Sequence, residues 1–94
     1  MSTAPYDLVV AGPAAAALAN KLPEAVAAAV IELITGPLLE APRHIGVPLR
    51  DELEGLWSAR RGTYRVVYRI DDTDRIVEVL RISHRSDAYR PAGS

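Results

Sequence analysis

The chain has 94 residues, 49% of them hydrophobic, and a formal net charge of −1. A chain of this length forms one small domain, expected to span residues 1–94, and its high apolar content with low net charge excludes intrinsic disorder. Because it contains no cysteine, it has neither a disulfide framework nor a thiolate metal site.

The first half of the chain predicts a short strand followed by a helical hairpin. Residues 6–11 (Tyr-Asp-Leu-Val-Val-Ala) favour a strand, which Gly12-Pro13 ends. Residues 14–21 are rich in alanine, the best helix former, and residues 23–35 place apolar side chains three and four apart, as on one face of a helix. Proline at the start of this second helix and Gly36-Pro37 at its end support these limits.

The second half predicts three strands in quick succession after a connector over residues 41–53. The strands cover residues 56–61, 64–71 and 75–83, and such short intervening turns require antiparallel neighbours. The last run is almost continuously apolar, which suits a central strand. We therefore expect an α+β fold with two N-terminal helices packed on one face of a four-stranded, mainly antiparallel sheet, and with the first strand beside a later one.

Arginine side chains gather on the sheet face away from the helices. Along residues 64–71, Val66 and Tyr68 alternate with Arg65 and Arg69, so the apolar side chains meet the helices and the guanidinium groups lie opposite. The planar guanidinium suits phosphate, and this face therefore indicates a polyanionic partner. The alternative is a solvated face whose arginines pair with acidic neighbours such as Glu78.

The charge distribution along the chain agrees with a polyanionic partner. Residues 1–54 carry three basic and seven acidic side chains, whereas residues 55–94 carry eight arginines and five acidic side chains. His84, Arg85 and Tyr89 directly follow the last predicted strand. Positive charge beside an aromatic ring suits a phosphodiester and a stacked base.

Several segments resemble the RelE superfamily. Residues 53–68 (Leu-Glu-Gly-Leu-Trp-Ser-Ala-Arg-Arg-Gly-Thr-Tyr-Arg-Val-Val-Tyr) are similar to its central segment, and residues 82–90 (Ile-Ser-His-Arg-Ser-Asp-Ala-Tyr-Arg) are similar to its closing motif. Lys-Leu-Pro at residues 21–23 and Gly-Val-Pro-Leu at residues 46–49 also resemble the family, particularly its actinobacterial members. The resemblance covers essentially the whole chain.

The resemblance implies a toxin of a type II toxin–antitoxin system, active as a ribosome-dependent endoribonuclease. Such a toxin cleaves mRNA in the ribosomal A site by attack of the ribose 2′-OH on the adjacent phosphate, with no metal or other cofactor. This reaction needs an acceptor for the 2′-OH proton, positive charge beside the phosphorane and a proton for the leaving 5′-oxygen.

The resemblance also implies specific partners. We expect a cognate RelB-like antitoxin, the 70S ribosome and mRNA, and operator DNA contacted through the antitoxin. No membrane partner is expected. The expected location is the cytoplasm, because the chain lacks cysteine and its N-terminus has no basic region followed by a long apolar run.

The family motifs place candidate catalytic residues on this chain. Arg65 matches a phosphate-stabilising arginine, Arg85 an arginine that contacts the scissile phosphate, and Tyr89 a tyrosine that stacks on or orients the substrate. His84 is a candidate acid or base, since histidine titrates near neutral pH. The residues expected to bind RNA or its phosphates are Arg60, Arg61, Arg69 and Arg81.

One departure from the family keeps other functions open. Many members carry two lysines where this chain has Leu56 and Ser58, so either Arg60 or Arg61 replaces the missing charge or cleavage is weak. The alternatives are a ParE-like inhibitor of DNA gyrase on the same fold, and a catalytically weakened toxin that acts as a binding or co-repressor module.

Overall fold

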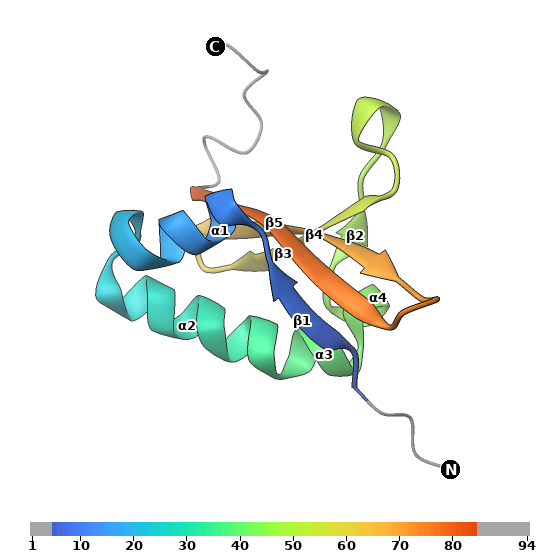
Figure 1. Ribbon diagram of the computed structural model, residues 1–94. Coiled ribbons are helices and arrows are strands. Elements are labelled where there is room, and N and C mark those ends of the chain that lie inside the picture. Colours follow the sequence, from blue (N-terminus) through green and yellow to red (C-terminus); the bar gives the residue numbers. More distant parts are fainter. Residues whose placement is uncertain (1–4, 85–94) are drawn as a thin grey trace.

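A five-stranded sheet with the order β1-β5-β4-β3-β2 lies at the centre of the computed structural model, which describes residues 5–84 (Figure 1). β1 (Asp7–Val10) runs parallel to β5 (Ile76–His84), and β4 (Tyr64–Asp71), β3 (Leu56–Arg61) and β2 (Val47–Pro48) follow as antiparallel neighbours. The expected mainly antiparallel sheet, with the first strand beside a later one, is confirmed.

The expected number of four strands was wrong by one. The additional strand, β2, pairs Val47 with Ser58 and Pro48 with Trp57 at the edge of the sheet. Two residues are too few to show an alternating pattern, and proline is depleted in strands except at sheet edges. The connector sequence therefore carried no signal for this strand.

The helical segments lie mainly between β1 and β2. They are α1 (Gly12–Ala16), η1 (Ala17–Lys21), α2 (Glu24–Thr35), α3 (Pro37–Glu40), α4 (Pro42–Ile45) and, between β2 and β3, the 3₁₀ turn η2 (Asp51–Leu53). The first predicted helix is thus split, because η1 is a π-helix that closes with a hydrogen bond from the Leu22 amide to the Ala17 carbonyl at 3.1 Å. α2 begins after Pro23 with Glu24 in its first turn, where a carboxylate complements the helix dipole.

α2 runs along one face of the sheet, and the hydrophobic core lies between them (Figure 1). Val30, Leu33 and Ile34 are its buried residues, at the spacing that places them on one side of a helix. Val66 and Tyr68 of β4 are fully buried, as the alternation predicted. Burial of each large aliphatic side chain contributes about 1.5–3 kcal/mol, so the packing of α2 on the sheet stabilises the fold.

A β-bulge interrupts the regular pairing of β4 with β5. Val67 pairs with Arg81 whereas Tyr68 pairs with Val79, so Leu80 is the extra residue. Val79 is buried on the helix side, whereas Leu80 and Arg81 both line a groove on the other face. The bulge therefore turns two consecutive side chains toward the open face of the sheet.

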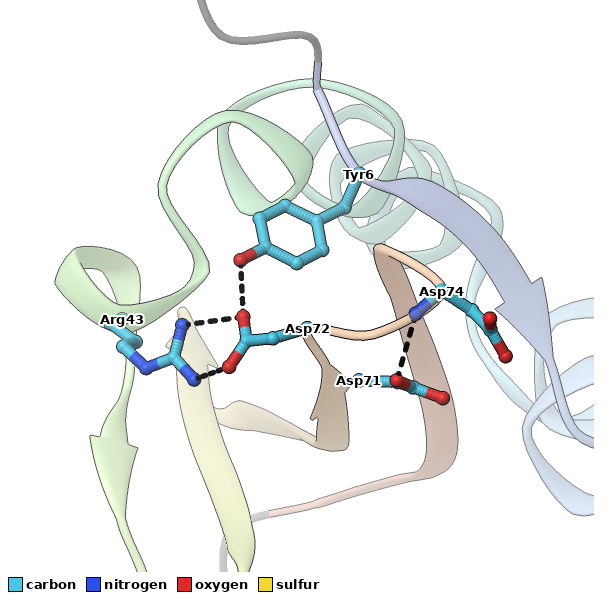
Figure 2. Close-up of polar contacts among 5 residues, drawn as sticks. All are labelled: Tyr6, Arg43, Asp71, Asp72 and Asp74. Carbon is cyan, nitrogen blue, oxygen red and sulfur yellow. Dashed lines mark hydrogen bonds and ion pairs between the residues drawn. The ribbon is translucent and has the colours of Figure 1, made fainter.

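A polar cluster joins the start of β1, α4 and the β4–β5 turn (Figure 2). Arg43 donates to both carboxylate oxygens of Asp72, at 3.1 and 2.6 Å, and the Tyr6 hydroxyl donates to the same carboxylate at 2.6 Å. These hydrogen bonds, that of Arg43 above all, lower the pKa of Asp72 below its ordinary value. The cluster holds together three segments that are far apart in the sequence.

Between residues 5 and 84, no helix combines the length and the apolar character required to cross a membrane.

Candidate functional site

A groove of about 500 Å³ crosses the sheet on the face opposite α2. β3, β4 and β5 form its floor, the segment between β2 and β3 supplies one wall, and Pro13 of α1 lies at the other side. Figure 1 shows the β2–β3 segment rising away from the sheet, on the side opposite α2. The polar side chains of the groove are Ser58, Arg65, Arg81 and Ser83, and the apolar ones are Pro13, Leu49, Leu53, Leu56, Val67 and Leu80.

Arg65 lies at the centre of the polar part of this groove. Its Nη1 donates to the Ser58 hydroxyl at 3.5 Å, and its strand position faces Arg60 on β3 and Ser83 on β5. Ser58 is only 5% exposed although it faces away from the helices, because the groove wall covers it. The half-buried Arg65 therefore carries its charge at the floor of a partly desolvated groove, where electrostatic interactions are stronger than in water.

Two of the four arginines expected to bind phosphate lie beside Arg65. Arg81 lines the groove because of the bulge, and Arg60 is exposed on the same face, directly across the strand pair from Arg65. Their guanidinium groups add positive charge to the open face. An anion bound against Arg65 would therefore experience the charge of at least two neighbouring arginines.

The other two arginines form ion pairs with carboxylates. Arg61 lies on the helix side of β3, with its Nη2 3.7 Å from the Glu32 carboxylate of α2. Arg69 lies on the open face but pairs with Glu78 of β5, the cross-strand partner considered from the sequence. Both arrangements are typical of surface ion pairs that join neighbouring elements.

The remaining candidates do not lie in the groove. His84 packs against Tyr64, with 5.3 Å between the ring centroids and an angle of 84° between the rings, and together they border a second hollow beside η1. Arg85 and Tyr89 lie outside the described residues. The part of the chain that the structure describes thus brings Arg65 and Arg81 together in the groove, whereas His84 lies in the lining of the second hollow.

Sequence reasoning missed the apolar walls of the groove. Leu49 and Leu53 belong to the connector, where their spacing follows no periodic pattern. Leu56 and Ser58, where many family members carry lysines, both line the groove, so their location agrees with the resemblance while their chemistry differs. Among residues 5–84 there is no cluster of three or more histidine, aspartate or glutamate side chains that could hold a metal ion.

Comparisons with known proteins agree on the family. Residues 6–89 match the model of the ParE toxin of the type II toxin–antitoxin system parDE. The chain is 52% identical over 86 residues to toxin RelE of Mycobacterium tuberculosis, covering 92% of this chain and 88% of that protein. It is 54% identical over 71 residues to toxin RelG of the same organism, covering 76% of this chain and 82% of that protein.

A solved structure shows the same fold. A chain of the toxin–antitoxin complex RelBE2 from M. tuberculosis superposes with a TM-score of 0.82 at 48% identity, covering 87% of this chain and 100% of that chain. The family model matches most of the sequence, and the relatives are aligned over most of their own length. The chain therefore belongs to the RelE/ParE superfamily, the toxins of type II toxin–antitoxin systems.

Proposed function

We propose that this toxin is an endoribonuclease that cleaves mRNA in the A site of the 70S ribosome and so stops translation. The observation that carries the proposal is the position of Arg65, half-buried over Ser58 in the open-face groove and joined there by Arg81. Two guanidinium groups in a partly apolar groove provide the electrostatic environment that a phosphorane requires. The high identity to a curated RelE toxin supports the same reading.

The proposed reaction is a transesterification within the RNA strand. The ribose 2′-oxygen forms a bond to the adjacent phosphorus while the bond from phosphorus to the 5′-oxygen breaks, leaving a 2′,3′-cyclic phosphate and a free 5′-OH. Arg65 and Arg81 balance the extra negative charge that develops on the phosphoryl oxygens. Loss of one such stabilising donor typically reduces the rate by about a hundredfold or more.

The reaction also moves two protons, one from the 2′-OH and one to the leaving 5′-oxygen. His84 packs on Tyr64 away from the groove, so its position offers no direct support for a role as acid or base. We propose that Arg85 contacts the scissile phosphate and that Tyr89 stacks on or orients the substrate, as the family motif implies, and His84 stays the candidate acid or base. Arg60 is the proposed replacement for the missing lysine charge, because it shares the open face with Arg65.

The proposed partners follow from the relatives. The similar M. tuberculosis chain was solved in a toxin–antitoxin complex, and an archaeal RelE–RelB complex from Pyrococcus horikoshii has the same fold at 25% identity. We therefore propose a RelB-like antitoxin that neutralises this toxin in the cytoplasm and links it to operator DNA.

The test is in-vitro translation of a defined message, followed by primer extension to map cuts. Codon-phased cuts that require ribosomes are expected from the unmodified toxin, with a loss of about a hundredfold or more in Arg65→Ala and in Arg85→Ala. The matched control is Arg61→Ala, which removes an arginine from the opposite face and is expected to change the rate less than about threefold. Thermal unfolding of each variant verifies that the fold persists.

The same assay separates the alternative functions. An intact message with normal translation would overturn the proposal. Inhibition of gyrase supercoiling would then favour a ParE-like activity, which is supported by the match to the ParE toxin family model. Cuts that persist in Arg65→Ala would remove Arg65 from the catalytic site.

A further inference from the structure

A second hollow lies where β5 extends beyond its parallel neighbour. β1 pairs only with the first part of β5, from Ile76 to Val79, although β5 continues to His84. α1 and η1 pass beside the remainder of β5, and a hollow of about 440 Å³ is left between them. This volume is within the range typical of small-ligand sites.

The lining of this hollow includes two cationic and two aromatic side chains. Lys21, the only lysine of the chain, lies at one side at the end of η1, and Arg81 lies at the other on β5. Tyr64 and His84, packed edge to face, contribute their rings, and the lining is completed by Pro13, Ala17, Leu22, Ile82 and Ser83. Two positive side chains beside aromatic rings suit a phosphate linked to a planar base.

The backbone of η1 positions Lys21. A π-helix is rare and is found mainly as a single wide turn, frequently at functional sites. Here the turn ends at Lys21 and is closed by the hydrogen bond from the Leu22 amide to the Ala17 carbonyl. Because a π-helix rotates less per residue than an α-helix, Lys21 lies on the side of η1 that faces β5. Residues 1–54 carry more acidic than basic side chains, and Lys21 is one of the three basic ones.

The hollow is continuous with the groove. Pro13, Arg81 and Ser83 line both of them, so Arg81 stands at their junction. An RNA strand whose scissile phosphate lies against Arg65 would therefore pass Arg81 and enter the second hollow with its next nucleotide. A further hollow shares Leu49 and Leu56 with the groove, but its charged side chains are Arg50, Asp51 and Glu54, a net negative lining that suits a nucleotide less well.

We propose that this hollow, the Lys21 pocket, binds the nucleotide that adjoins the one in the groove. Lys21 pairs with its phosphate, and Tyr64 and His84 offer ring surface to its base. The inference rests on the proposed ribonuclease function, since it extends the path of the same substrate. Arg81 then contacts both nucleotides, whereas Lys21 contacts only the nucleotide in the Lys21 pocket.

Fluorescence anisotropy with short 2′-O-methylated RNA, which cannot be cleaved, tests this pocket in the full-length toxin. Lys21→Gln is expected to weaken binding of a labelled tetranucleotide about fivefold and to reduce the slope of log Kd against log salt by about 0.7, as for one lost phosphate contact. Binding of a dinucleotide is expected to change less than twofold, because it fits within the groove. Lys21→Arg is expected to restore the tetranucleotide affinity.

The matched control is Asn20→Asp, which changes the net charge equally at the neighbouring, exposed residue outside the pocket lining. Equal tetranucleotide affinity for Lys21→Gln and the unmodified toxin, or an equal loss in Asn20→Asp, would overturn the proposal. Displacement of the tetranucleotide by an acidic peptide that also requires Lys21 would instead assign the pocket to a protein partner.

Failure of the pocket and failure of the proposed function give different results. A toxin that cleaves mRNA on ribosomes but shows no effect of Lys21→Gln retains the function and loses the pocket. A toxin that cleaves nothing but loses tetranucleotide affinity in Lys21→Gln retains the pocket as an RNA-binding site and loses the nuclease.

Discussion

The buried hydroxyl of Tyr68 joins the sheet to the connector, and Tyr68→Phe tests this link. Tyr68 is fully buried, and its hydroxyl donates to the Pro42 carbonyl at 2.5 Å. Removal of the hydroxyl keeps the shape of the ring and leaves the carbonyl without that donor. A buried acceptor that loses its partner costs about 1–3 kcal/mol, so the free energy of unfolding at pH 7 should fall by that amount.

The pH dependence sharpens this prediction. Burial raises the pKa of Tyr68 to about 12, against the opposing effects of the Gly46 amide and Arg43. An unfolded tyrosine releases its proton near pH 10, so between about pH 10 and 12 the unfolded chain binds fewer protons than the folded one, and stability falls as pH rises. The contribution of Tyr68 is nearly complete below about pH 10, and about 2 kcal/mol is lost by pH 12.

Urea unfolding monitored by circular dichroism between pH 7 and 12 measures both effects. The unmodified protein is expected to be the more stable at pH 7 and to lose this advantage over Tyr68→Phe by pH 12. A constant difference between the two proteins from pH 9 to 12 would refute the argument, since it would mean that Tyr68 titrates equally in the folded and unfolded chains.

Gly46 provides a second perturbation of the same contact. A Cβ atom at this position would overlap the Tyr68 hydroxyl and lie 2.8 Å from the Ser58 carbonyl oxygen. Gly46→Ala should therefore cost about 1–3 kcal/mol in the unmodified protein, as is typical of overpacking. The cost should be smaller in the Tyr68→Phe background, where only the Ser58 contact remains, and equal costs in the two backgrounds would contradict this geometry.

Three further predictions concern other parts of the fold. Asp72→Asn should reduce the loss of Tm that acid causes below about pH 4. The ionised Asp72, whose pKa is lowered in the folded protein, stabilises the fold at pH values above its ordinary pKa, and this stabilisation disappears as the pH falls. Gly62→Ala should lower the urea-derived stability by about 1 kcal/mol, since Gly62 has a φ of +63° that an L-residue adopts at a cost. Leu38→Ala should cost about 2–5 kcal/mol in the same assay, because Leu38 is fully buried, and a smaller loss would contradict its position in the core.

Local patterns predicted much of the architecture. The alternation of β4 predicted that Val66 and Tyr68 face the helices and that Arg65 faces away, because successive side chains of a strand point to opposite sides. The spacing of apolar residues predicted α2, and the short turns predicted the antiparallel β3–β4–β5 meander. Each of these depends on residues close together in the sequence.

The individual arginines could be assigned only in part. Arg60 and Arg61 were both expected to bind RNA, and nothing in the sequence indicated that Glu32 of α2 lies opposite Arg61. Glu78 was foreseen as a possible partner of the arginines on β4, and the strand register decided that it meets Arg69 and not Arg65. The orientation of Arg81 depends on the bulge in β5, which its continuous apolar run conceals.

The sequence by itself determined the α+β order of elements, the two faces of the central strand and the family motifs around Arg65. Only the tertiary structure decided the edge strand β2, the apolar walls of the groove and the separation of His84 from Arg65. The physical reason is that helical and strand periodicity arises from neighbouring residues. Strand register, bulges and the closure of a groove depend on contacts between segments tens of residues apart, which no local pattern encodes.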